Sequence, residues 1–129
     1  MKLTTLATVI ASSLAFAGNT AAYTCYSDGF AWNSAQRLDA LALVDGWCNK
    51  LGRRYFAGGE QVKECIGSFD NGRNKLQLRI KNGLSGGTFL EPNTCRAQMN
   101  PIVNGCARGG YEDNANGWRP RVDPGTGCD

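Results

Sequence analysis

The sequence predicts an α+β fold in which two helices pack on an antiparallel sheet of about five strands, held by three disulfides. Apolar residues recur at helical spacing over residues 35–51, which indicates a long amphipathic helix. Apolar and charged residues alternate over residues 74–81, which is typical of a strand with one buried and one wet face. Six cysteines in so short a chain indicate a small domain stabilised by disulfides.

Residues 1–22 have the composition of a secretory signal peptide. Lys2 is followed by an apolar run up to Ala17, by two helix-breaking residues, and by small residues up to Ala22. The run is shorter than the roughly 20 residues that a transmembrane helix needs, although a membrane anchor or a buried N-terminal helix is the alternative interpretation. We expect cleavage after Ala22, or else after Ala17, and a secreted, extracellular domain formed by residues 23–129.

The first part of this domain predicts a strand, a helix and a second strand. Residues 23–26 are rich in aromatic and Thr residues, which favours an initial strand. The helix over residues 35–51 is capped by Asn33 or Ser34, and Gln36 stands three residues after Asn33, as in a capping box. Gly52 ends this helix, and residues 53–57 form a short strand.

The middle of the domain predicts a β-hairpin. Its arms span residues 60–69 and 74–81, and the sequence Asp70-Asn71-Gly72 between them suits a tight turn. One face of the second arm carries a polar stripe, formed by Lys75, Gln77, Arg79 and Lys81. This stripe is a solvated face, or alternatively a face that contacts a glycan or a second subunit.

The last part of the domain predicts a loop, a helix and a strand. Residues 83–87 are a flexible loop, and residues 92–103 form a helix with Pro92 in its first turn. Pro101 is expected to kink this helix or to mark its end. Residues 118–123 form the last strand, and Pro120 favours an edge position for it.

All six cysteines follow the signal peptide, and an even number in a small secreted chain predicts three disulfides. The pairing is left open by the sequence, with Cys106–Cys128 as the preferred pair. Zinc is a poor alternative, because the chain has no histidine and no Cys-x-x-Cys motif. The cysteines concerned are Cys25, Cys48, Cys65, Cys95, Cys106 and Cys128.

Composition excludes several classes of function. The chain has no histidine, and therefore lacks the commonest general base and the commonest metal ligand. The formal net charge is +3, and the basic residues are spread along the chain rather than clustered. This pattern argues against a nucleic-acid partner and against membrane insertion.

The C-terminal third resembles a family of small secreted fungal glycan-binding proteins, typified by the ink-cap mushroom lectin. The similarity extends over residues 23–129. The residues that carry it best are Cys95 and Cys106 with ten residues between them, Gly109-Gly110, Trp118, Asp123-Pro124-Gly125 and Cys128. The resemblance implies a lectin without enzymatic activity or cofactor, built as an α/β sandwich. It further implies a homodimer joined edge to edge through its sheets, and recognition of a fucosylated GalNAc–GlcNAc glycan. The resemblance assigns no binding residues to positions of this sequence.

The polar stretch 109–119 is the best candidate for a ligand-binding loop. Its Asp, Asn and Arg side chains suit sugar hydroxyls, and a Tyr or Trp ring suits the C–H face of a sugar. The alternative is a polar turn whose Asn residues bond their own backbone while the Trp packs in the core. The candidate ligand-binding residues are Tyr111, Asp113, Asn114, Asn116, Trp118 and Arg119.

Two tryptophans lie outside this stretch. Trp32 precedes the first helix, where it either attaches that helix to the sheet or offers a second aromatic platform. Trp47 lies in the middle of the helix, which predicts a core position.

Three other functions are weaker alternatives. Residues 112–123 resemble a calcium loop, but its first and last acidic residues are exchanged, so we expect no metal. A glycoside hydrolase needs two converging carboxylates, and the candidates are Glu60, Glu64, Asp113 and Asp123. A secreted toxin or effector acting on membranes or channels would have a similar scaffold, although the chain has no basic amphipathic helix.

Overall fold

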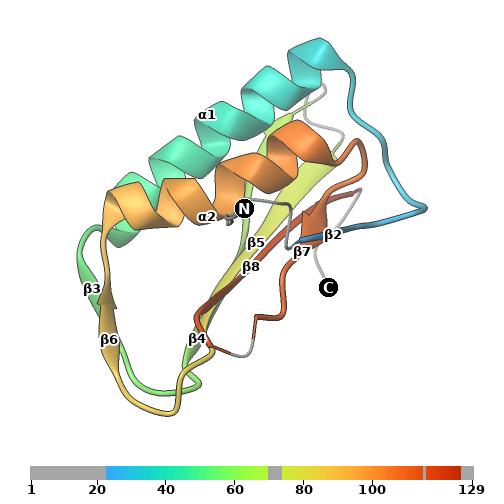
Figure 1. Cartoon of the computed structure of the whole chain (residues 1–129). Coiled ribbons are helices and arrows are strands. Elements are labelled where there is room, and N and C mark those ends of the chain that lie inside the picture. Colours follow the sequence, from blue (N-terminus) through green and yellow to red (C-terminus); the bar gives the residue numbers. More distant parts are fainter. Residues whose placement is uncertain (1–22, 70–73, 115, 126–129) are drawn as a thin grey trace, which may run out of the picture.

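The computed structural model describes residues 23–69, 74–114 and 116–125 (Figure 1). The predicted signal peptide, the predicted hairpin turn and Cys128 lie outside the described residues. Two helices and seven strands are found in this part of the chain. In chain order they are β2 (Thr24–Cys25), α1 (Ser34–Leu51), β3 (Arg54–Phe56), β4 (Gln61–Phe69), β5 (Asn74–Asn82), β6 (Thr88–Leu90), α2 (Pro92–Gly105), β7 (Gly110–Tyr111) and β8 (Trp118–Gly125).

The predicted α+β architecture is confirmed. Five strands form an antiparallel sheet in the order β2-β7-β8-β5-β4, while β3 and β6 pair separately as a two-stranded antiparallel sheet. The two helices lie side by side on one face of the larger sheet (Figure 1). The core between the helices and this sheet includes Val44, Trp47, Leu76, Leu78, Ile80, Met99, Ile102, Val103 and Val122.

Helix α1 begins as the sequence predicts. The side chain of Asn33 accepts a hydrogen bond from the Gln36 amide at 2.8 Å, and the Gln36 side chain accepts one from the Asn33 amide at 2.9 Å. This capping box satisfies two amides that would otherwise lack helical partners. The helix ends at Gly52, whose φ of 62° falls in the region that favours glycine. Trp32 and Trp47 are both buried in the core, as their packing interpretation predicts.

The composition of the five-stranded sheet differs from the prediction. Residues 54–56 belong to the small sheet, where they pair with β6, a strand that the sequence did not predict. The fifth strand of the main sheet is β7 instead. A Cβ atom on Gly110 would collide with the Thr24 carbonyl, so only glycine lets β7 approach β2 this closely. Gly110 lies in the stretch that was predicted as a loop, but its lack of a side chain allows β7 to pair with β2.

The predicted edge position of Pro120 is wrong, because β8 lies between β7 and β5. The Pro120 carbonyl accepts a hydrogen bond from the Glu112 amide. The carbonyl of Pro120 therefore points toward β7 and not toward β5. The amide and carbonyl of one residue point to the same side of an antiparallel strand. The donor that proline lacks would therefore have faced Glu112, the residue after β7, so the ladder bond is lost where the pairing of β7 with β8 ends.

Pro101 does not end the second helix, which continues to Gly105. A proline inside a helix leaves the carbonyl four residues earlier without its amide partner. Here that carbonyl belongs to Ala97, and both Ala97 and Pro101 are exposed. The unpaired carbonyl therefore lies on the wet side of α2, where its cost is smallest.

Two disulfides are seen among the described residues, against three predicted. Cys25 bonds to Cys106, and Cys48 bonds to Cys95, which ties α1 to α2. The first bond excludes the preferred pair Cys106–Cys128: β7 pairs with β2, and this brings Cys25 beside the end of α2. Cys65 is also disulfide-bonded, while Cys128 lies outside the described residues, so the third bond stays a prediction.

Within the part of the chain that the structure describes, neither helix combines the length and the apolar character that crossing a membrane requires.

Candidate functional site

The face of the large sheet that points away from the helices carries a row of polar side chains across all five strands. Each member is the register partner of the next, and register partners in an antiparallel sheet share a face. Their chain neighbours Leu78 and Val122 point the other way and are fully buried in the core. In strand order the row is Thr24, Tyr111, Arg121, Arg79 and Lys63.

Two tyrosines meet at one end of this row. The ring centroids of Tyr26 and Tyr111 lie 5.6 Å apart, with an angle of 35° between the ring planes. Both side chains are half-buried. Burial raises the pKa of the Tyr26 hydroxyl, although Arg121 acts in the opposite direction. The pair therefore offers an aromatic surface next to a line of cations.

An ion pair fixes the middle of the row. The Arg79 guanidinium donates to the Asp113 carboxylate at 3.2 Å, and Asp113 belongs to the predicted loop. The Arg79 side chain is only 10% exposed, whereas that of Asp113 is 57% exposed. The buried cation thus holds the exposed carboxylate in place, and Asp113 keeps free acceptor capacity toward solvent.

An open pocket of about 520 Å³ lies at the same end of the sheet, lined by Thr24, Tyr111, Glu112, Asp113 and Asn114. Burial raises the pKa of the Glu112 carboxyl. Burial also raises the pKa of Asp123 on the neighbouring strand, and the nearby Arg121 partly opposes this effect. The pocket offers hydroxyl, carboxylate and amide groups beside an aromatic ring, which is the set of groups that a sugar ring needs.

Three of the predicted ligand-binding residues hold the loop together. The Asn114 side chain accepts a hydrogen bond from the Asn116 amide at 3.0 Å, which is an Asx turn. The Arg119 Nε donates to the Asn114 carbonyl at 2.8 Å. The Gly83 amide donates to the Gly117 carbonyl, which attaches the loop to the end of β5. Asn116 and Arg119 thus shape the site, while Asn114 both shapes it and lines the pocket.

Trp118, the predicted sugar platform, lies elsewhere. It precedes Arg119 in β8 and therefore points to the opposite side of the strand. Its ring packs edge-to-face on Phe56, with centroids 5.2 Å apart and an interplanar angle of 81°. The ring is partly buried against the core.

The structure therefore brings together Tyr111, Asp113 and Asn114 from the predicted set, and places Trp118 apart from them. Sequence reasoning missed Thr24, Tyr26 and Arg121. The alternation of Arg119, Arg121 and Asp123 along the last strand was a usable signal, because period-two polarity marks the wet face of a sheet. The neighbourhood of Tyr26 and Tyr111 has no signal in the sequence, since it depends on the pairing of β2 with β7.

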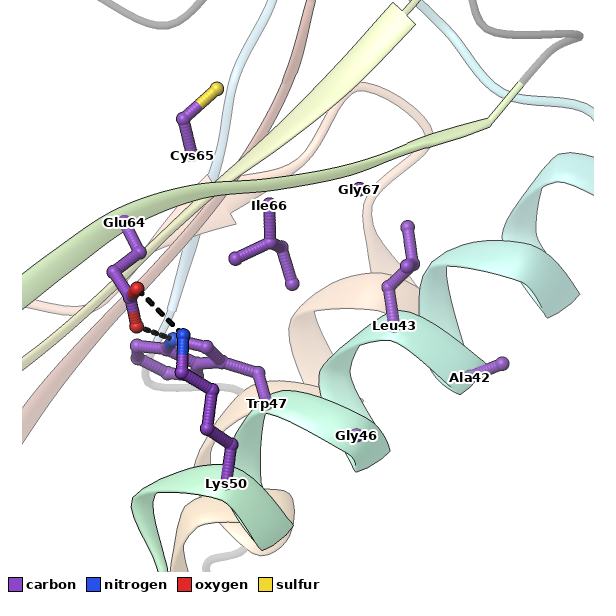
Figure 2. A pocket seen from close by; sticks show the side chains of 9 residues that line it. All are labelled: Ala42, Leu43, Gly46, Trp47, Lys50, Glu64, Cys65, Ile66 and Gly67. Atoms are coloured by element: carbon purple, nitrogen blue, oxygen red, sulfur yellow. Dashed lines mark hydrogen bonds and ion pairs between the residues drawn. The ribbon is translucent and has the colours of Figure 1, made fainter.

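A second pocket, of about 400 Å³, lies between α1 and the edge strand β4 (Figure 2). Its apolar side is formed by Leu43, Trp47 and Ile66. Glu64 accepts hydrogen bonds from Trp47 Nε1 at 2.6 Å and from Lys50 Nζ at 2.9 Å. These two donors lower the pKa of the Glu64 carboxyl, with the Lys50 hydrogen bond as the larger cause. Cys65 points to the other side of the strand (Figure 2).

Three of the four candidate glycosidase carboxylates are held by partners in this structure. Glu64 is bound as described above, and Glu60 accepts hydrogen bonds from Arg54 at 3.0 Å and from the Ala57 amide at 2.8 Å. Asp113 is bound to Arg79. A general acid of this class needs a raised pKa. The pKa of Glu64 is lowered, whereas burial raises that of Asp123, the fourth candidate. In the described part of the chain, no group of three or more acidic, Cys or His side chains is placed to hold a metal ion.

The chain matches no protein-family model and no curated protein.

Proposed function

We propose that this protein is a secreted lectin that binds glycans reversibly, without metal and without catalysis. The binding site is the end of the sheet face formed by Thr24, Tyr26, Tyr111, Asp113 and Arg121. The observation that carries the proposal is the contact of Tyr26 with Tyr111 beside a pocket lined by carboxylate and amide groups. Aromatic rings bury sugar C–H surface at low entropic cost, while the polar groups select the hydroxyl pattern.

The resemblance to the fungal glycan-binding family supports the same proposal and suggests a fucosylated GalNAc–GlcNAc glycan as the ligand. We further propose a homodimer in which two sheets join along an edge. Within the described sheet the edge strands are β2 and β4, and β4 is the longer, with nine residues. A long edge strand presents many unpaired amide and carbonyl groups to a second copy. Two sites in one dimer would raise avidity on a cell surface.

A glycan array tests the proposal. The oxidised protein is applied with and without a chelator, and the array glycans are afterwards examined by mass spectrometry. The proposal expects selective signal that survives chelation and leaves every glycan intact. Cleaved glycans would favour a carboxylate-based hydrolase, and a signal that the chelator removes would contradict metal-free binding. If the array is silent, leakage from glycan-free vesicles would favour the toxin alternative.

A further inference from the structure

The small sheet formed by β3 and β6 carries two large aromatic side chains on its outer face. Tyr55 and Phe89 are register partners, and their side chains are 53% and 46% exposed. Their ring centroids lie 5.3 Å apart in an edge-to-face arrangement. The inner face of the same sheet carries Phe56 and Leu90, which are fully buried. The small sheet is thus fixed to the core on one side and presents aromatic rings on the other.

Neighbouring residues hold both exposed rings in position. The Arg53 guanidinium lies 3.8 Å from the centre of the Phe89 ring, and its Nε donates to the Glu91 carboxylate at 2.8 Å. The Tyr55 ring lies across Gly87, where a Cβ atom would overlap its hydroxyl end. Together these contacts hold the two aromatic rings in place at the surface.

The charged groups around the rings indicate the chemistry of a ligand. The side chains of Arg53 and Glu91 are 60% and 49% exposed, so both keep unused hydrogen-bonding capacity. A sugar ring presents one face of C–H groups and an equator of hydroxyls. The Arg53 guanidinium covers one face of the Phe89 ring, so the Tyr55 ring supplies the aromatic surface for the sugar. The guanidinium and the Glu91 carboxylate beside it can meet the hydroxyls.

We propose that Tyr55, Phe89, Arg53 and Glu91 form a second carbohydrate-binding site. This site takes a β-linked sugar of gluco configuration, whose axial hydrogens make both ring faces apolar and whose hydroxyls are all equatorial. It is a separate site, formed by other strands than the Tyr26–Tyr111 face, and it goes beyond the proposed function because it makes each chain bivalent. A bivalent chain would link neighbouring glycans without dimerising.

Two other occupants fit the surface less well. A stable interface with a second copy uses roughly 20–30 residues a side, whereas each strand here has three residues. A membrane surface would favour aromatic and basic residues without an acid, whereas Glu91 here neutralises Arg53.

Titration with defined sugars tests the site. The ¹⁵N-labelled, oxidised protein is titrated with cellotriose and with its N-acetylated counterpart, and backbone amide shifts are followed by NMR. We expect saturable shifts at residues 53–56 and 87–91 for at least one of the two sugars, with Tyr55→Ala weakening the binding at least tenfold. Shifts confined to the Tyr26–Tyr111 face would overturn the second site and leave the proposed function standing. Shifts confined to the small sheet would support the second site, and the glycan array then decides the proposed function separately.

Two glycine variants provide a matched comparison that keeps every aromatic ring. Gly87→Ala pushes against Tyr55, whereas a Cβ atom on Gly86 meets nothing within 4 Å. We expect Gly87→Ala to weaken several-fold the binding of whichever sugar binds, cellotriose or its N-acetylated counterpart chitotriose. We expect Gly86→Ala to leave that binding unchanged. Equal binding by both variants would overturn the proposal, as would the absence of any shift in the small sheet. Sedimentation of the wild type and of Tyr55→Ala tests whether the surface binds a second copy instead. A dimer in the wild type that becomes a monomer in Tyr55→Ala would assign the surface to self-association and overturn the proposal.

Discussion

Tyr26 and Tyr111 stand in contact, with ring centroids 5.6 Å apart, although 85 positions separate them in the chain. The contact depends on β2 pairing with β7, in which Thr24 lies opposite Tyr111 and the Tyr26 amide donates to the Gly109 carbonyl. The disulfide from Cys25 to Cys106 fixes the same junction. Strand pairing and a covalent bond therefore build the aromatic surface together.

Tyr26 is expected to act through its ring. Tyr26→Ala should weaken glycan binding about tenfold, which corresponds to roughly 1.4 kcal/mol of lost aromatic contact. Tyr26→Phe should keep most of the affinity, because the ring and its contact with Tyr111 remain. Calorimetry on both variants measures the difference. Equal losses in the two variants would assign the effect to the hydroxyl and not to the ring.

Glu64 is expected to make stability depend on pH in the acidic range. Its pKa is lowered in the folded protein, so its contribution is complete above the ordinary value of 4.5 and is lost as the pH falls through the lowered pKa. Glu64→Gln should destabilise the protein by no more than about 1 kcal/mol at pH 7, because the Lys50 side chain is 65% exposed and solvent screens its ion pair with Glu64. The difference should shrink as the pH drops below 4.5, and urea unfolding at several pH values measures it. A difference that is constant with pH would contradict this role.

Two glycines at the pocket between α1 and β4 should respond in opposite directions. Gly46 lies inside α1, and a Cβ atom there meets nothing within 4 Å, so Gly46→Ala should stabilise the fold by about 0.5–1 kcal/mol. Gly67 has a φ of +50°, and a Cβ atom there would collide with the Leu43 side chain, so Gly67→Ala should destabilise it by about 1 kcal/mol or more. Chemical unfolding of both variants gives the two signs. A destabilised Gly46→Ala would show that the pocket needs the glycine for another reason.

The third disulfide is expected to join Cys65 and Cys128. Cys65 is disulfide-bonded, and the four other described cysteines are paired among themselves, which leaves Cys128 as its partner. Proteolysis without reductant, followed by mass spectrometry, should recover this pair together with Cys25–Cys106 and Cys48–Cys95. A peptide that links Cys106 to Cys128 would contradict the fold, because it would separate Cys25 from the end of α2.

Local sequence signals predicted the parts of the fold that local physics determines. The capping box of Asn33 and Gln36 depends on near neighbours in the chain and was found as expected. The alternation along β5 correctly placed Leu76, Leu78 and Ile80 in the core. The expected solvated face is wrong at Gln77 and Arg79, which are buried between the neighbouring strands. Pro120 and Gly110 were misjudged because their roles depend on a partner strand that only the fold supplies. The residues of the candidate site also separate into those that the local sequence identifies and those that only the fold places. Tyr111 and Asp113 were identified from their own loop, whereas Tyr26 reaches them through long-range pairing, and Trp118 is directed into the core by the register of β8.

The most direct test of the central claim is a calorimetric titration of the glycan that binds best on the array. The titration is carried out on the wild type, on Tyr111→Ala, and on Leu38→Ala, an exposed apolar residue of α1 that serves as control. We predict saturable binding to the wild type and to Leu38→Ala, at least tenfold weaker binding to Tyr111→Ala, and recovery of unchanged glycan. Equal affinity in Tyr111→Ala, with its fold intact, or release of a cleaved product would contradict the account.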